Sequence, residues 1–108
     1  MHVRLKSRGN TLVVSIFGEL DHHTVDELRQ KVDNEIIKSS TKNVVFDFSH
    51  VNFMDSSGIG VIMGRYKNIQ CLKGQLAVVC LKPQIKRIFE MSGLSKIIRI
   101  YDSLEQAL

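Results

Sequence analysis

Residues 43–60 read NVVFDFSHVNFMDSSGIG, and this stretch decides the fold. Its first part, Asn43 to Ser49, is a nearly continuous run of β-branched and aromatic residues, which is typical of a strand buried on both faces. His50 to Asp55 is expected to form the loop that follows. From Ser56 onward, apolar residues recur at spacings of three and four, which indicates a helix. We therefore expect a central strand that leads through a short loop into a helix.

The same alternation of strands and helices extends over the rest of the chain. The further predicted elements are strands at Val3–Ser7 and Thr11–Leu20, a helix from Thr24 to about Ser39, a strand at Gln75–Leu81, a helix that starts at Pro83 and ends just before Gly93, a strand at Ile97–Tyr101 and a short helix after Asp102. The first two strands form a hairpin, and the later crossovers are expected to be right-handed and parallel. The sequence therefore predicts one α/β domain over residues 1–108, a mixed sheet of about five strands with about four helices packed on it.

Local signals mark where several of these helices begin and end. Thr24 and Glu27 have the spacing of a capping box, and Asp21 is a second candidate cap. Gly74 is expected to end the second helix as a C-terminal glycine cap. Asp102–Glu105 has the spacing of another capping box at the last helix.

The composition is that of a globular protein without membrane or nucleic-acid features. Hydrophobic residues make up 44% and charged residues 24% of the 108 residues. No apolar run is long enough to span a membrane and no signal-peptide pattern is present, so we expect a cytoplasmic protein. The net charge is +4, but the basic residues are scattered, and we expect no direct binding to nucleic acid.

The two cysteines, Cys71 and Cys80, lie in different predicted elements and lack metal-ligand spacing. We expect both to be small buried hydrophobic residues, as in most cytosolic proteins. A disulfide between them stays open at this point.

Ser56 and Ser57 fall in the first turn of the predicted second helix. The backbone N–H groups there lack partners within the helix, and the positive end of the helix dipole favours a negative charge. One hydroxyl could simply cap the helix, and Asp55 could cap it as well. Gly58 and Gly60 leave little side-chain bulk around the hydroxyls. The residues alone leave two interpretations open, a plain cap or a serine that is modified or contacted by a partner.

Enzymatic and metal-binding interpretations of this region have less support. The pattern Asp-Ser-Ser-Gly is not the Gly-x-Ser-x-Gly of a nucleophile elbow. Gly58 and Gly60 match only part of a phosphate-binding glycine pattern. His22 and His23 are adjacent at a helix start, so we expect their rings to point in different directions, and no second ligand pair has metal spacing. We therefore expect no catalytic residue, no metal ion and no cofactor.

Two further carboxylates, Glu19 and Asp21, lie at the end of the second predicted strand. Because the carboxyl ends of parallel strands meet at one edge of a sheet, we expect them to lie near Ser57, where α/β proteins bind ligands and partners. Capping explains Asp21 but leaves Glu19 unexplained.

Three blocks of sequence resemble one known family. They are Gly18–Thr24 (GELDHHT), Phe53–Lys67 (FMDSSGIGVIMGRYK) and Met91–Ile98 (MSGLSKII). In this order they resemble the anti-sigma factor antagonists, which belong to the STAS domains (sulfate transporter and anti-sigma factor antagonist). The similarity covers essentially the whole chain and is greatest to the sporulation members of spore-forming Firmicutes, the anti-sigma F factor antagonists.

The resemblance implies a regulatory role and names its partners. Ser57, the second serine of Asp-Ser-Ser-Gly, would be the phosphate acceptor. The cognate anti-sigma factor would be the serine protein kinase, bound to ATP or ADP, and the unphosphorylated antagonist would bind it and free the sporulation sigma factor F. A metal-dependent serine phosphatase would restore the unphosphorylated form, and the free chain would be a monomer.

The same resemblance implies the partner contacts. The expected partner-binding residues are Glu19, Asp21, Asp55, Ser56, Ser57, Gly58, Ile59, Gly60 and Arg65. General stress and stressosome members share Asp-Ser-Ser-Gly but act with a different kinase and sigma factor, and they are the alternative. Gly18–His23 and Gly64–Lys67 favour the sporulation branch.

Overall fold

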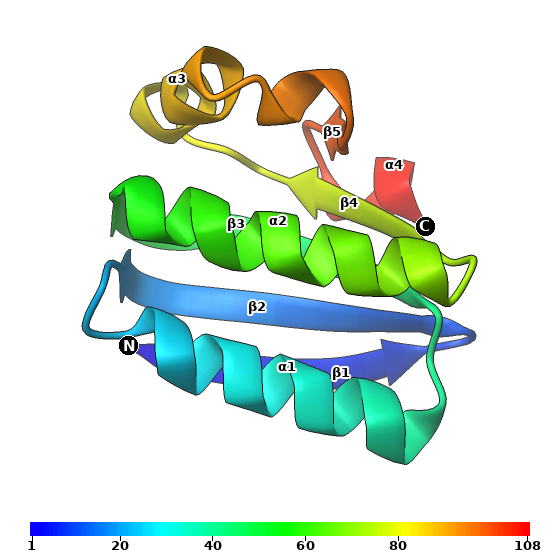
Figure 1. Cartoon of the computed structure of the whole chain (residues 1–108). Coiled ribbons are helices and arrows are strands. Elements are labelled where there is room, and N and C mark those ends of the chain that lie inside the picture. Colours follow the sequence, from blue (N-terminus) through cyan, green and yellow to red (C-terminus); the bar gives the residue numbers. More distant parts are fainter.

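The computed structural model describes all 108 residues, which form a five-stranded sheet with helices packed on it (Figure 1). The strands, in their spatial order, are β1 (His2–Arg8), β2 (Thr11–Leu20), β3 (Asn43–Met54), β4 (Gln75–Val79) and β5 (Arg99–Tyr101). β1 is antiparallel to β2, and every other neighbouring pair is parallel. The predicted α/β fold with a mixed sheet is therefore confirmed.

Two long helices lie across the same face of the sheet (Figure 1). The helices are α1 (Val25–Ser39), α2 (Ser56–Cys71), α3 (Pro83–Met91) and the short α4 (Leu104–Ala107), with a 3₁₀ turn, η1, at Leu94–Lys96. Leu28, Val32 and Ile36 are buried at a spacing of four residues, which turns one side of α1 toward the sheet. The predicted helical periodicity is confirmed.

The sheet has a hydrophobic cluster on each face, because successive side chains of a strand point to opposite sides. Val44 and Phe46 belong to the large cluster shared with α1 and α2, whereas Val45 belongs to a small cluster covered by α4. Phe48 and Phe89 meet edge to face with ring centres 5.7 Å apart, which fixes α3 to the sheet.

Strand β3 is longer than predicted and takes the place of the expected loop at His50–Asp55. It continues to Met54 and pairs with β2 up to Leu20. Val51 and Met54 are buried while Asn52 is exposed, and the β2–β3 register is interrupted by bulges, so this part of the strand does not alternate regularly. The prediction of a loop was therefore wrong. As a consequence, β2 and β3 end side by side.

Three smaller expectations also need correction. Helix α2 ends at Cys71, and Gly74 is required for another reason: a Cβ atom there would lie only 1.5 Å from the backbone oxygen of Lys42. The last strand begins at Arg99, two residues late, because η1 occupies the preceding turn. The last capping box is present one residue later than predicted, with the side chain of Gln106 accepting a hydrogen bond from the backbone of Ser103 at 3.3 Å.

Both cysteines are free thiols. Cys80 is half-buried, whereas Cys71 is exposed at the end of α2, so the expectation of burial is wrong for Cys71. The cause is the helix period, which turns this last residue of α2 away from the sheet.

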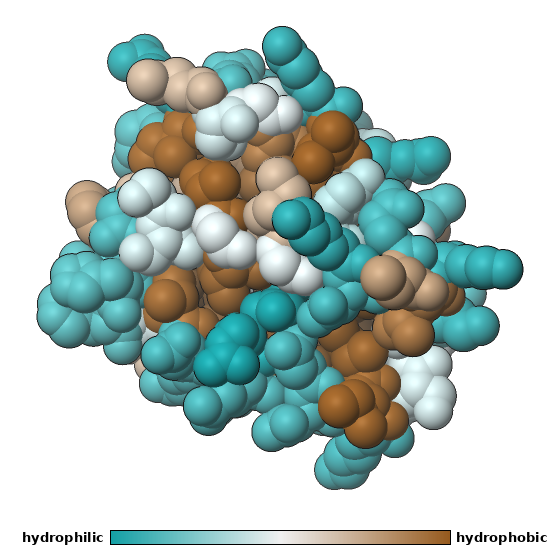
Figure 2. Space-filling view, viewed as in Figure 1, coloured by the Kyte–Doolittle hydropathy of each residue, from teal (hydrophilic) through white to brown (hydrophobic).

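The surface is polar with scattered hydrophobic patches (Figure 2). One patch lies where α1 and α2 end, and it includes Ile37 and Leu72, which are 79% and 42% exposed. It lies at the opposite ends of these helices from the residues described below. No helix of the chain combines the length and the apolar character that crossing a membrane requires.

Candidate functional site

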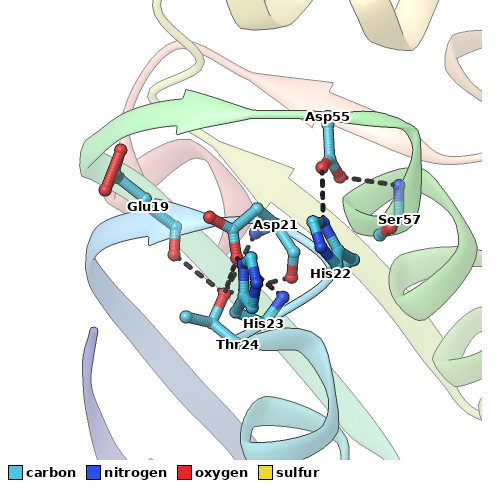
Figure 3. A network of polar contacts seen from close by, with 7 residues as sticks. All are labelled: Glu19, Asp21, His22, His23, Thr24, Asp55 and Ser57. Atoms are coloured by element: carbon cyan, nitrogen blue, oxygen red, sulfur yellow. Dashed lines mark hydrogen bonds and ion pairs between the residues drawn. The ribbon is translucent and has the colours of Figure 1, made fainter.

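Most of the residues singled out in the sequence lie where β2 and β3 end and the helices α1 and α2 begin, among them Glu19, Asp21, Asp55 and Ser57 (Figure 3). Leu20 pairs with Met54 in the parallel register, and the backbone N–H of Asp55 donates to the backbone oxygen of Leu20 at 3.3 Å. Asp21 and Asp55 are therefore neighbours at one edge of the sheet. This is the edge at which open α/β sheets bind ligands and partners.

Asp55 is the N-cap of α2. Its Oδ1 accepts a hydrogen bond from the backbone N–H of Ser57 at 2.8 Å, so neither serine hydroxyl is needed as the cap. Partial burial acts to raise the pKa of Asp55, but the hydrogen bonds from Ser57 and the proximity of His22 outweigh it and hold the pKa below its usual value. The carboxylate is therefore charged near neutral pH.

His22 connects the loop after β2 to this cap. Its Nδ1 lies 3.8 Å from Oδ2 of Asp55, which makes an ion pair whenever the imidazole is protonated (Figure 3). The rings of His22 and His23 lie with their centres 3.9 Å apart, so the prediction that they point in different directions was wrong. Both rings fold over the same short turn and are exposed.

Thr24 organises the turn between β2 and α1 but does not form the predicted capping box with Glu27. Its hydroxyl accepts from the backbone N–H of Asp21 at 3.0 Å and donates to the backbone oxygen of Glu19 at 3.0 Å. Asp21 in turn accepts from the backbone N–H of His23 at 2.9 Å. The capping box does not form because the Thr24 hydroxyl is already hydrogen-bonded to the backbone of Asp21 and Glu19 at the end of β2. Glu19 contributes its backbone oxygen, and its carboxylate points away into solvent (Figure 3).

The two serines differ in their surroundings. Ser56 is exposed, whereas Ser57 is half-buried and lines a groove between α1 and α2. No hydrogen bond joins a histidine ring to either hydroxyl in this structure. The arrangement offers an accessible hydroxyl in the first turn of a helix that a neighbouring carboxylate already caps.

The glycines and the isoleucine after the serines have distinct environments. Gly58 is buried, and a Cβ there would lie 2.3 Å from Cγ of Met54. Gly60 is exposed with nothing within 4 Å of such a Cβ. Ile59 is half-buried against the main core. Of the three, Gly60 therefore leaves the most open approach to the start of α2.

Arg65 is buried rather than displayed. Its side chain is 8% exposed, and its Nε lies 2.9 Å from Oδ1 of Asp33 on α1. The N–H is poorly aligned with that oxygen, so the contact is an ion pair more than a hydrogen bond. Burial lowers the pKa of Arg65, the charge of Asp33 opposes this, and the charge of Arg29 adds to the lowering. Sequence reasoning did not single out Asp33 or Arg29, although Asp33 lies next to the buried Val32.

The chain has no group of three or more histidine, cysteine, aspartate or glutamate side chains placed to hold a metal ion. The site therefore consists of hydroxyls, carboxylates, two imidazoles and two guanidinium groups. Such groups can accept a phosphate, repel it or bind it, depending on their charge.

Comparisons with known proteins show which family the chain is similar to. The STAS domain model matches residues 2–107. The chain is 41% identical over 108 residues to an anti-sigma F factor antagonist from Paenibacillus polymyxa. The aligned region covers the whole of this chain and 92% of that relative. An anti-sigma-B factor antagonist from Listeria monocytogenes is 28% identical, covering 91% of this chain and 86% of the relative.

A solved structure shares the fold over almost its whole length. The phosphorylated form of the Bacillus cell fate determinant SpoIIAA superimposes with a TM-score of 0.77 at 30% identity, covering 98% of this chain and 96% of that chain. The chain therefore belongs to the STAS domain family, and the relatives it resembles are anti-sigma factor antagonists.

Proposed function

We propose that this protein is an anti-sigma factor antagonist controlled by phosphorylation of Ser57. In its unphosphorylated form it binds the cognate anti-sigma factor, a serine protein kinase, and so frees the sporulation sigma factor F. The observation that carries the proposal is the half-buried Ser57 hydroxyl beside the α2 cap, at the sheet edge that also holds Asp21 and Asp55. The similarity to an anti-sigma F factor antagonist supports the same reading.

The chemical step is the transfer of a phosphoryl group. The Ser57 oxygen attacks the γ-phosphorus of ATP held by the kinase, the bond between that phosphorus and the oxygen bridging to the β-phosphate breaks, ADP leaves, and a base of the kinase takes the hydroxyl proton. A metal-dependent serine phosphatase then hydrolyses the ester and returns the hydroxyl. This chain supplies the acceptor and the recognition surface, and the kinase and phosphatase supply the catalysis.

Charge explains how the phosphate switches binding. It adds about −1.5 to −2 at the edge where Asp55 and Asp21 are already negative. The start of α2 offsets part of this repulsion within the chain. A partner surface matched to a neutral hydroxyl must desolvate the phosphate or separate from it, and a few kcal/mol of coupling release the complex.

The exposure of the expected partner-binding residues supports the proposed partner surface. Glu19 and Ser56 are exposed at the edge, and Asp21, Asp55, Ser57 and Ile59 are half-buried there. Gly60 leaves open space for an approaching backbone, whereas Gly58 and Arg65 are buried below this surface. We infer that the kinase, bound to ATP or ADP, contacts the exposed and half-buried residues directly, with Gly58 and Arg65 supporting them. The free chain is inferred to be a cytoplasmic monomer without direct contact to nucleic acid or membrane.

The alternative is a regulator of the general stress or stressosome type, with a different kinase and sigma factor. The similarity to an anti-sigma-B factor antagonist favours it, although the identity is only 28%. A binding assay separates the two: the protein is mixed with purified anti-sigma F factor and, in parallel, with purified anti-sigma-B factor. Selective capture of the first supports the sporulation role, and selective capture of the second replaces it.

The phosphorylation itself is tested by intact mass spectrometry after incubation with the kinase and ATP. We expect one added phosphate on the wild type and on Ser56→Ala, and none on Ser57→Ala. Ser56 is the matched control, since it is the adjacent hydroxyl in the same turn. No phosphate on any of the three would refute the switch, and a phosphate lost only in Ser56→Ala would move the site to Ser56.

A further inference from the structure

Ser57 opens into a groove that contains two arginines. The groove lies between the first turns of α1 and α2 and is lined by Val25, Asp26, Arg29, Ser57, Gly60, Val61 and Arg65. The four lining residues of α2 recur at helical spacing and form one stripe on its surface. Ser56 is outside this lining. Of the two serines, only Ser57 therefore shares a groove with guanidinium groups.

Arg65 lines this groove, and two of its buried nitrogens have no hydrogen-bond partner. Its side chain is 8% exposed, and its Nε and Nη1 have no hydrogen-bond partner within the chain. Asp33 balances its charge at 2.9 Å but does not satisfy these donors. Buried donors without partners are unfavourable, so a small shift of the Arg65 side chain toward an anion in the groove would be favoured.

Arg29 is held only weakly by its ion pair with Asp26. Its Nη2 lies 3.6 Å from Oδ1 of Asp26, and the two side chains are 45% and 81% exposed, so this pair is weak and solvent-screened. Arg29 and Arg65 both line this groove, one from α1 and the other from α2. A doubly charged phosphate with three acceptor oxygens competes well against one exposed carboxylate for such a group.

We propose that Arg29 and Arg65 form a receptor within the chain for the phosphate on Ser57. The inference rests on the proposed phosphorylation of Ser57. Arg29 leaves Asp26 and binds the phosphate through its planar fork of N–H groups. Ser57 and Arg65 are eight residues apart, about 12 Å along the axis of α2. Arg65 lines the same groove as Ser57, and because helical side chains lean toward the N-terminus, it supports the phosphate from behind.

The receptor gives the phosphorylated state a defined structure. The phosphate lies in the groove, where the positive ends of α1 and α2 also act on it, rather than extending freely into solvent. A phosphate on Ser56 would lack these partners. The fold thus holds phosphate at position 57 selectively.

The test uses the full chain with phosphoserine introduced at position 57 by genetic encoding, so that no kinase is needed. The second pKa of the phosphate, about 6 when free, is measured by phosphorus NMR titration. The comparison proteins carry phosphoserine at position 56, or phosphoserine at 57 together with Arg29→Gln or with Arg87→Gln. Arg87 is an exposed arginine on α3 outside the groove and is the matched control.

We expect the pKa at position 57 to lie about half a unit or more below that at position 56. Arg29→Gln should reduce this difference, because only Arg65 then remains in the receptor, and Arg87→Gln should leave the difference unchanged. Asp26, Asp33, Asp55 and His22 are unchanged between these variants, so the change reports Arg29. Equal pKa values with and without Arg29 would overturn the proposal.

Arg65 is tested without mutation, because removing a buried cation endangers the fold. Its Nε–H resonance should shift when position 57 carries phosphate and stay in place when position 56 does. An unchanged resonance would remove Arg65 from the receptor. These measurements are independent of the kinase, so a failure of the kinase assay would refute the proposed function, whereas an ordinary phosphate pKa would refute only the receptor.

Discussion

Gly58 and Gly60 stand two residues apart in the first turns of α2, but the space around them differs. A Cβ at Gly58 would lie 2.3 Å from Cγ and 2.6 Å from Sδ of Met54, and 3.3 Å from Cδ2 of Leu20. A Cβ at Gly60 would meet nothing within 4 Å. We predict that Gly60→Ala stabilises the protein and that Gly58→Ala destabilises it relative to Gly60→Ala.

The magnitude follows from two opposing effects. Alanine is about 1 kcal/mol more favourable than glycine inside a helix, and this gain applies at both positions. At Gly58 the methyl group forces Met54 to move, and Met54 is only 3% exposed, so overpacking costs about 1–3 kcal/mol. The propensity gain cancels in the comparison. Gly58→Ala should therefore be about 1–3 kcal/mol less stable than Gly60→Ala.

Urea unfolding followed by circular dichroism measures this difference, with the denaturant slope as a check that only stability has changed. A difference of 1 kcal/mol corresponds to roughly 4 °C in Tm for a domain of this size. Equal stability of the two variants would show that Met54 relocates without cost. The packing argument for a glycine at position 58 would then be refuted.

Three more predictions follow from single contacts. The pKa of Asp55 in the folded protein lies below 3.8, so its charge adds stability that is lost as the pH falls through that pKa. In urea unfolding, the wild type should have a higher free energy of unfolding than Asp55→Asn at about pH 7, and this difference should shrink toward about pH 2. Gly74→Ala should cost about 3 kcal/mol or more in unfolding free energy, since the new methyl meets the Lys42 backbone; unchanged stability contradicts this. Cys71 should react with a thiol reagent faster than Cys80, because burial and nearby carboxylates raise the pKa of Cys80. Equal reaction rates would contradict this.

The helices could be predicted from sequence because each carries its own periodic signal. Leu28, Val32 and Ile36 show which side of α1 is buried without reference to any other element. The second half of β3 carried no such signal. Val51 and Met54 are buried three residues apart, which fits neither regular strand alternation nor a loop, and the bulged pairing with β2 explains it. That explanation depends on a partner strand distant in the sequence.

The candidate site likewise combines a local feature that could be predicted from sequence with contacts between distant elements that could not. The cap from Asp55 to Ser57 spans two residues and could be proposed from sequence, although only the structure decides between the aspartate and the serines. The contact of His22 with Asp55 and the pair of Arg65 with Asp33 join elements distant in the chain, and no local pattern predicts them. Arg65 illustrates the consequence: resemblance implies a partner contact, whereas the structure shows a buried side chain.

The identity of the cap decides whether a phosphate switch at Ser57 is compatible with the fold. If a serine oxygen capped α2, phosphorylation would remove or replace a contact worth about 1 kcal/mol and would couple regulation to helix stability. Asp55 supplies the cap instead, through an oxygen that the proposed modification does not touch. The Ser57 side chain is then free of that structural duty, and the groove with Arg29 and Arg65 offers its phosphate a place within the existing fold. A reversible charge at this position can therefore alter what the surface binds while the helix that presents it stays in place.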